Sequence, residues 1–283
     1  MATIDFHVHL PVPEWLEGSL GPYLESAERY FRTRATARPM EDLAAEYERL
    51  DLVGVLLAWD AETYTGRPAL SNELVAGVVE RFPGRFVGFG SVDPHKPDAD
   101  EQVRRLPDLG LLGLKLHPTM QGFDPSSDAA MRLFEAAAKA ALAVITHAGT
   151  SGLGAGCPGG LGLRIDLARP ILLDRAAAAF PEMPIVLAHV GWPWHLETLA
   201  MALHKSNIFI DISGWRYRYL PPEVVRDMKG RLSGQFLFGT DAPMFSPADL
   251  LQEFAGLELP DGVGAKILSE NAKIGRASCR ERV

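Results

Sequence analysis

The sequence predicts a single (β/α)8 barrel, and three observations support this prediction. The chain has 283 residues, a length that suits one such barrel, since these domains typically have about 250 residues. Eight short apolar runs alternate with longer helical patterns along the chain. No stretch rich in Gly, Ser or Pro divides it into domains, so we expect one domain over residues 1–272.

The eight predicted strands are short, mostly continuously apolar, and rich in Val, Ile, Leu and Phe. This composition is typical of parallel strands that are buried on both faces. The strands are expected at residues 3–9, 52–59, 86–92, 111–117, 143–149, 185–191, 208–214 and 236–242.

Helical patterns fill the intervals between the strands and follow the last one. Several of them open with Pro, Asp or Ser, which favour the first turn of a helix. The predicted helices cover residues 40–50, 69–82, 98–109, 127–142, 170–180, 195–205, 221–232 and 247–257.

Two connections are longer than usual for this fold. Residues 10–39 follow the first strand and contain several aromatic residues and four arginines. Residues 150–168 follow the fifth strand and are rich in glycine. Long loops in a compact domain often form functional lids, so we expect both segments to lie as loops over the site.

Composition excludes several classes of function. The formal net charge of −8 argues against nucleic acid or an anionic membrane as the main partner. Cys157 and Cys279 form no CxxC motif, so neither a disulfide framework nor a cysteine zinc site is expected. The sequence shows no apolar run long enough to span a membrane and no secretory signal, and we expect a cytoplasmic protein.

The last eleven residues, 273–283, do not resemble part of the fold. Their sequence is KIGRASCRERV, and one back-translation of it resembles a common sequencing adapter. We therefore interpret this tail as non-native and leave it out of the fold prediction.

Imidazole side chains gather at the predicted strand ends. The carboxyl ends of the strands carry the active site in this kind of barrel. Eight histidines placed at random would put about one among the roughly 24 strand-end positions. The sequence has five there: His7, His9, His117, His147 and His189.

The spacing of these residues predicts a metal site. His7 and His9 are two residues apart on a strand, so their side chains point to the same side. His147 and Asp241 end the fifth and eighth strands and would approach the same point. Three imidazoles and one carboxylate suit a divalent ion, most of all Zn²⁺. His117 fits a hydrogen-bonded core histidine equally well.

At these positions the sequence resembles the amidohydrolase superfamily. The segments that carry the resemblance are DFHVH, GLKLHP, VITHAG, VLAHVGWPW, LFGTDAP and ILSENA. They are most similar to the amidohydrolase-related (amidohydrolase 2) family, in the branch that contains aminocarboxymuconate-semialdehyde decarboxylase. The resemblance covers residues 1–272 and implies a (β/α)8 barrel with a catalytic divalent metal.

The resemblance also assigns roles to individual residues. It implies His7, His9, His147 and Asp241 as metal ligands, and His189 as the residue that orients or deprotonates the metal-bound water. We expect His189 and Asp241 together to hold that water and move its proton. Lys115 ends the fourth strand, where some two-metal relatives carry a carboxylated lysine. The decarboxylase branch typically lacks this lysine, which leaves open a second ion, a contact with the substrate carboxylate, or a structural pair with a site carboxylate.

The resemblance leaves the reaction open. The leading interpretation is a metal-dependent hydrolase of a small organic substrate that carries a carboxylate, and the alternative is a non-oxidative decarboxylase. A metal-free hydrolase and a catalytically inactive binding barrel are further alternatives. Members of the family often form homodimers, which is an expectation for this chain as well.

Candidate substrate contacts follow the sixth and seventh strands and the glycine-rich loop. An aromatic wall with an arginine would suit an aromatic or unsaturated carboxylate. Packing of the loops is the simpler role for each of these residues. The candidates are Trp192, Trp215, Arg216 and Arg164.

Overall fold

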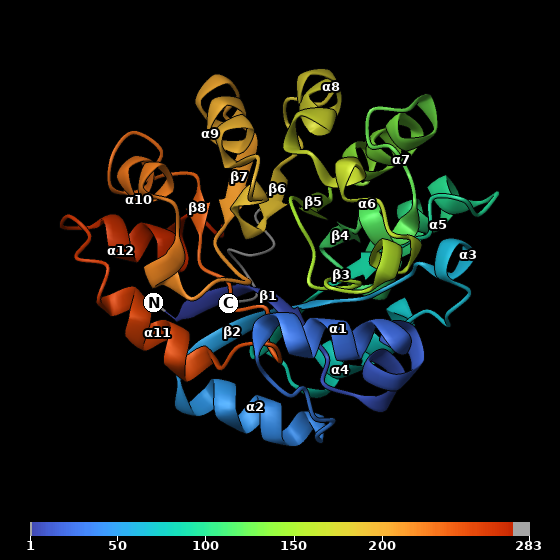
Figure 1. Cartoon of the computed structure of the whole chain (residues 1–283), viewed down its shortest axis with the longest axis horizontal. Helices are drawn as coiled ribbons and strands as arrows, with labels where there is room; N and C mark the ends of the chain where they lie inside the picture. Colours follow the sequence, from blue (N-terminus) through green and yellow to red (C-terminus); the bar gives the residue numbers. More distant parts are fainter. Residues whose placement is uncertain (1, 274–283) are drawn as a thin grey trace.

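Eight parallel strands form one sheet in the order β1 to β8, with each strand beside its neighbours in sequence. The computed structural model describes residues 2–273. Helices surround the sheet (Figure 1), so the predicted (β/α)8 barrel is confirmed. The strands are β1 Thr3–His9, β2 Leu52–Leu57, β3 Phe86–Ser91, β4 Gly113–Leu116, β5 Ala143–His147, β6 Ile185–Ala188, β7 Ile208–Asp211 and β8 Phe236–Leu237.

Each predicted helix has a counterpart in the structure, with ends that differ by a few residues. The α-helices are α1 Pro22–Phe31, α2 Met40–Arg49, α3 Glu62–Thr65, α4 Asn72–Arg81, α5 Ala99–Arg105, α6 Pro118–Gln121, α7 Asp128–Lys139, α8 Asp174–Ala179, α9 His195–His204, α10 Pro222–Lys229, α11 Pro247–Ala255 and α12 Val263–Ala265. The shorter helical turns are η1 Glu14–Leu20, η2 Leu106–Leu109, η3 Pro158–Gly162, η4 Ile165–Ala168, η5 Pro170–Leu173, η6 His189–Gly191, η7 Tyr217–Tyr219 and η8 Lys266–Glu270.

The segment between β1 and α2 is largely helical, so the prediction of a loop over residues 10–39 is wrong for η1 and α1. Pro22 stands in the first turn of α1, where a missing N–H costs nothing. Tyr23 and Ala27, one turn apart, are buried. The apolar positions in this segment are spaced at the helical period, which the aromatic and arginine content obscured.

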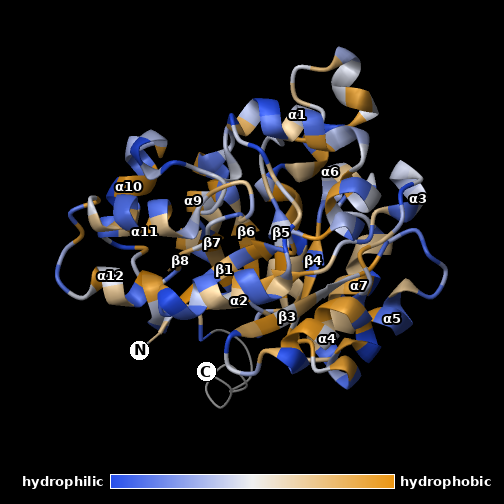
Figure 2. Ribbon diagram, turned by 90° about the horizontal axis from the view of Figure 1, so that it is seen from below, coloured by the Kyte–Doolittle hydropathy of each residue, from blue (hydrophilic) through white to orange (hydrophobic). Residues whose placement is uncertain are grey.

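Two apolar clusters fill the barrel. The smaller one lies inside the sheet and includes Ile4, Phe6, Val55 and Ile145. The larger one lies between the sheet and the helices, as the hydrophobic strands and the polar outer helix faces of Figure 2 show. Burial of both clusters is the main favourable contribution to folding.

The first strand contains a β-bulge that changes the direction of its side chains. Ile4 and Phe6 belong to the interior cluster, so strict alternation would turn His7 toward the helices. The pairing of β1 with β2 shifts register between Asp5 and Val8. Such a shift redirects the residues that follow it. His7 therefore faces the barrel interior, and Val8 joins the outer cluster.

Backbone hydrogen bonds close the barrel between β1 and the segment that begins with β8. The N–H of Phe6 donates to Phe238 O at 2.9 Å, and the N–H of Asp241 donates to His7 O at 2.9 Å. The N–H of His9 donates to Ala242 O at 2.8 Å. Asp241 is thereby held beside the strand that carries both histidines.

The buried carboxylate of Asp5 strengthens this closure. Thr240 donates to it twice, from its backbone N at 2.8 Å and from Oγ1 at 2.6 Å. The hydroxyl of Tyr47, on α2, donates to Oδ2 at 2.6 Å. Burial raises the pKa of Asp5 to about 6, and these hydrogen bonds oppose the rise. One carboxylate thus joins β1, α2 and the last strand segment.

No helix within residues 2–273 is long and apolar enough to cross a membrane. Residues 274–283 lie outside the described part of the chain, and so does nearly all of the tail that we interpret as non-native.

Replacement of Asp5 should destabilise the whole barrel. In Asp5→Ala, the buried donors of Thr240 and Tyr47 lose their acceptor, and we expect the free energy of unfolding to fall by about 3 kcal/mol. Urea unfolding followed by circular dichroism measures this. The matched control is Asp100→Ala, which removes an exposed acid paired with Arg104 and should leave the midpoint almost unchanged. Equal midpoints for the two variants would contradict the proposed role of Asp5.

Candidate metal and substrate site

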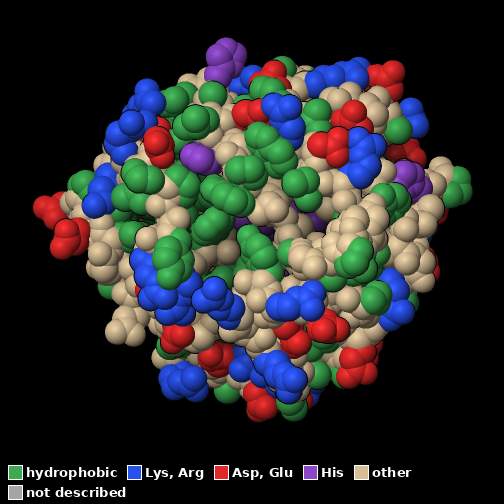
Figure 3. All heavy atoms as spheres, viewed as in Figure 1, with side chains coloured by type: hydrophobic (Ala, Val, Ile, Leu, Met, Phe, Trp, Pro, Cys, Tyr) green, Lys and Arg blue, Asp and Glu red, His purple; other side chains and the backbone are tan. Residues whose placement is uncertain are grey.

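A cavity of about 60 Å³ opens at the carboxyl ends of the strands. Figure 3 shows histidine side chains within a hollow near the centre of this face. Aromatic side chains from the segment after β1 and from the loops after β2, β6 and β7 form much of its wall. The imidazole and charged residues that line it are His7, His9, Lys115, His117, His147, His189 and Asp241.

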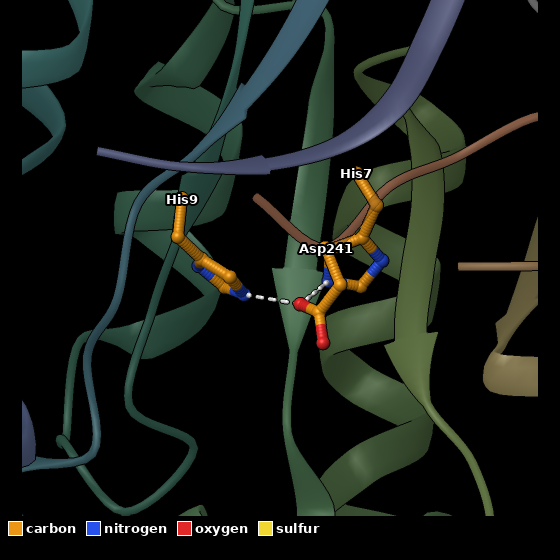
Figure 4. Close-up of side chains that lie close together, drawn as sticks. All are labelled: His7, His9 and Asp241. Atoms are coloured by element: carbon orange, nitrogen blue, oxygen red, sulfur yellow. Dashed lines mark ion pairs between the residues drawn. The ribbon is translucent and has the colours of Figure 1, made fainter. Parts of the chain in front are cut away.

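Three of these side chains form a compact set of donor atoms. Oδ1 of Asp241 lies 3.7 Å from Nε2 of His7 and 3.6 Å from Nε2 of His9 (Figure 4). All three groups offer atoms within 4.8 Å of one another and are buried. Two ligands of a tetrahedral zinc ion, each about 2.05 Å from it, lie about 3.3 Å apart. The set is therefore close to the spacing that a small divalent ion requires.

His7 is oriented by a carboxylate on the opposite side of its ring. Its Nδ1 lies 2.7 Å from Oδ2 of Asp211, the last residue of β7. Donation from Nδ1–H to Asp211 leaves the lone pair of Nε2 facing Asp241. A carboxylate behind a histidine in this way is common at metal centres, because it fixes the tautomer and makes the ligating nitrogen more basic.

A buried nitrogen atom of His147 supports the same interpretation. Nε2 of His147 has no hydrogen-bond partner within the described part of the chain. A buried polar atom without a partner is costly. A cation would satisfy the lone pair of Nε2 of His147, whose ring stands in the same cavity. These residues therefore fit a divalent metal, although His147 is not part of the three-residue cluster.

His189 directly follows β6 and has an unusual backbone conformation. Its φ is +60°, in the left-handed region, where non-glycine residues are uncommon. Its Nδ1 lies 3.1 Å from the carbonyl oxygen of Ser213 and 3.0 Å from its hydroxyl. Burial lowers the pKa of His189 to about 4, with Asp211 opposing the shift, so the imidazole is neutral at pH 7. Its second nitrogen is then a proton acceptor.

Lys115 is fully buried at the end of β4. Its Nζ lies 3.1 Å from Nε2 of His7. Burial lowers its pKa to about 8, while Asp241 and Asp211 act to raise it. Burial also raises the pKa of Asp241, and Lys115 lowers it. The positive charge of Lys115 and the negative charges of Asp241 and Asp211 thus stabilise one another in this buried site.

His117 belongs to the cavity as well as to the core. Its ring stacks on His147 with centroids 3.9 Å apart and an angle of 7° between the planes. Gln121 fixes its backbone, because Oε1 accepts from the N–H of His117 at 2.8 Å. Nδ1 of His117 accepts from the N–H of Met120 at 3.3 Å. The stack holds the His147 ring in one orientation.

The four predicted substrate contacts lie in different surroundings. Trp192 and Trp215 line the cavity, and the indole N–H of Trp215 donates to His189 O at 3.1 Å. Arg216 lies outside it and pairs with Glu253 at 2.6 Å. Arg164 is exposed and pairs with Asp166. The structure brings the two tryptophans to the site and leaves both arginines with acidic partners elsewhere.

Several residues of the site were absent from the prediction. Asp211 lies within the predicted strand 208–214, in IFIDIS, and an acid after three apolar residues was the signal for it. Trp15 and Trp59 both line the cavity. The ring of Trp15 stacks on His9 at 4.4 Å, and Trp59 meets His9 edge-on at 5.7 Å. Their place depends on η1 and on the loop after β2, which the sequence pattern did not resolve.

The chain belongs to the amidohydrolase family, whose pattern it matches over residues 4–273. No curated protein sequence matches it significantly.

Three solved structures share the fold over 96% of this chain. An uncharacterised TIM-barrel protein from Bordetella bronchiseptica is 22% identical, with a TM-score of 0.80 and 97% of its own chain covered. A probable 2-pyrone-4,6-dicarboxylic acid hydrolase from Acinetobacter baumannii, with citric acid bound, is 15% identical, with a TM-score of 0.65 and 98% of its own chain covered. A dihydroxybenzoic acid decarboxylase from Polaromonas, with manganese and 2-nitroresorcinol bound, is 16% identical, with a TM-score of 0.68 and 96% of its own chain covered.

Loss of Asp211 should weaken metal binding without removing a ligand. In Asp211→Ala, His7 loses the acceptor for its Nδ1–H, and we expect the affinity for Zn²⁺ and Mn²⁺ to fall by roughly tenfold to a hundredfold. Competition with a chromophoric chelator measures both affinities.

The matched control for Asp211→Ala is Asp93→Ala. Asp93 is a buried acid that lies two residues after β3 and accepts from the backbone N–H groups of Thr63 and His95. Its loss should leave metal affinity as in the wild type. Wild-type affinity in Asp211→Ala would contradict the orienting role of that residue.

Proposed function

We propose that this protein is a metal-dependent hydrolase of a small substrate that carries a carboxylate. The observation that supports this most strongly is the convergence of His7, His9 and Asp241 at 3.6–3.7 Å within a buried cavity. Membership of the amidohydrolase family agrees with it. The expected partner is a small molecule rather than nucleic acid or a membrane.

The residues that would hold the ion are His7, His9, His147 and Asp241. Bound there, a divalent metal would supply Lewis acidity and would lower the pKa of a coordinated water from about 16 toward 7. Zn²⁺ suits this mixture of nitrogen and oxygen ligands. Mn²⁺ is an equally direct candidate, because a decarboxylase of the same fold binds manganese. A single ion is the simplest assignment, and a second ion would require carboxylation of Lys115.

The remaining residues would position the reactants and move a proton. His189 is neutral and held through Nδ1, so its other nitrogen would accept a proton from the attacking water and return it to the leaving group. Asp241 would hold that water in place. Trp192 and Trp215 would contact the substrate at the cavity wall and restrict the size of substrate that fits. Arg164 and Arg216 would reach a substrate only after leaving their acidic partners.

Non-oxidative decarboxylation is the second candidate. The aromatic wall of the cavity favours it, since Trp15, Trp59, Trp192 and Trp215 would suit an aromatic acid. The same proton-moving residue would serve this reaction, because His189 could deliver a proton to the substrate carbon that loses CO₂. Lys115 would then contact the carboxylate of the substrate.

One assay separates the two reactions. Metal-loaded protein is incubated with 2-pyrone-4,6-dicarboxylate and with dihydroxybenzoates in water enriched in ¹⁸O. Hydrolysis should introduce ¹⁸O into the product without release of CO₂, whereas decarboxylation should release CO₂ without such incorporation. Release of CO₂ alone would replace the first candidate with the second. Turnover by protein stripped of metal would overturn the metal-dependent mechanism in favour of a metal-free hydrolase.

Two variants should distinguish metal binding from proton transfer. We expect His9→Ala to lose bound metal, because one of the three clustered ligands is removed. We expect His189→Asn to retain metal but to lower kcat by about 10²–10⁴-fold, as the loss of a general base does. Metal content by elemental analysis, measured beside kcat, tests both. If the wild type, purified without chelator, contains no metal, an inactive binding barrel is favoured instead.

A further inference from the structure

A tryptophan in the wall of the cavity has an unused hydrogen-bond donor. Nε1 of Trp15 is buried and has no partner within residues 2–273. The side chain is 2% exposed and lines the cavity. An indole N–H can only donate, and a buried donor without an acceptor costs free energy. In native proteins such an atom calls for an explanation, and a missing ligand is one.

The surroundings of Trp15 hold its ring in a fixed position. It stacks on His9 at 4.4 Å with an angle of 8° between the planes, so the N–H points along the face of that imidazole and not toward it. Trp59 meets it edge-on, with centroids 6.2 Å apart. The backbone N–H of Trp15 donates to Val12 O at 3.1 Å, which fixes the start of η1. A partner for Nε1 must therefore lie in the plane of the indole.

The unused donor of Trp15 contrasts with that of Trp215, whose N–H donates to His189 O. Trp15 thus offers a rigid donor beside His9, one of the three clustered ligand residues, with no acceptor in the described part of the chain.

We propose that the N–H of Trp15 donates a hydrogen bond to a carboxylate oxygen of the substrate. This inference rests on the proposed function and makes it more specific, because it assigns the substrate an anionic oxygen that lies beside the His9 ring while the reacting group faces the His7, His9 and Asp241 cluster. A carboxylate is the acceptor that best offsets the free-energy cost of burying this donor, because hydrogen bonds to ionised groups are stronger than those between neutral groups. Trp15 is in this way a specificity-determining residue.

The indole resonances provide a direct test on the intact protein. The chain contains five tryptophans, so a ¹H–¹⁵N spectrum of metal-loaded protein shows few indole signals, and Trp15→Phe identifies the one from Trp15. Benzoate serves as the probe. The Trp15 signal should move downfield as benzoate is added, while the signal of Trp194, which does not line the cavity, should stay in place.

Affinity provides the second measurement. Trp15→Phe keeps an aromatic ring against His9 but removes the donor, and it should weaken benzoate binding in calorimetry by about tenfold. The matched control is Trp194→Phe, since Trp194 packs under Arg169 and does not line the cavity. It should bind benzoate as the wild type does. Unchanged positions of the Trp192, Trp194 and Trp215 indole signals in Trp15→Phe show that the variant is folded.

The outcomes separate this inference from the function on which it rests. A Trp15 signal that does not move at any benzoate concentration, or equal affinities of the wild type and Trp15→Phe, overturns the role of Trp15. Metal binding and turnover that persist in that case leave the proposed function intact. Failure of the wild type to bind metal overturns the proposed function, and the indole spectrum recorded with benzoate alone still reports on Trp15.

Discussion

The β-bulge between Asp5 and Val8 determines which side chains of β1 face the interior, and the candidate site depends on it. Asp5, where the register shift begins, points toward the helices, and Phe6 packs inside the barrel. His7, within the shifted segment, and His9, beyond it, both face the cavity. A regular strand would have turned both imidazoles into the helix layer or displaced Phe6 from the core. One extra residue thus lets the same strand support the core and the site.

Closure of the barrel then supplies the third member of the cluster. Asp241 follows the short strand β8, and its backbone N–H is bonded to His7 O. Its φ is +63°, a conformation that Asp adopts more readily than most residues. The same contacts that seal the sheet therefore place a carboxylate against two imidazoles. Stability and site geometry share these hydrogen bonds.

The sequence was sufficient for the barrel and for most of the candidate residues, because both depend on local patterns. Apolar runs mark the strands, and chemistry-bearing residues at their ends mark the site. Other features depend on contacts across the sequence. The turn that carries Trp15 is ordered by its packing on His9, and Asp211 owes its role to a ring more than two hundred residues earlier. Arg216 was predicted to contact the substrate. It pairs instead with Glu253 on α11, a contact that no local pattern in the sequence indicates.

The link between Asp5 and Thr240 also has a consequence for biosynthesis. The two residues are separated by 235 positions. The Asp5 carboxylate lacks its two Thr240 donors until the segment after β8 has left the ribosome. Such a long-range contact adds to the entropic cost of closing the chain and slows the last step of folding. A nascent chain therefore keeps an open edge at β1 until the segment that begins with β8 has emerged and pairs with it.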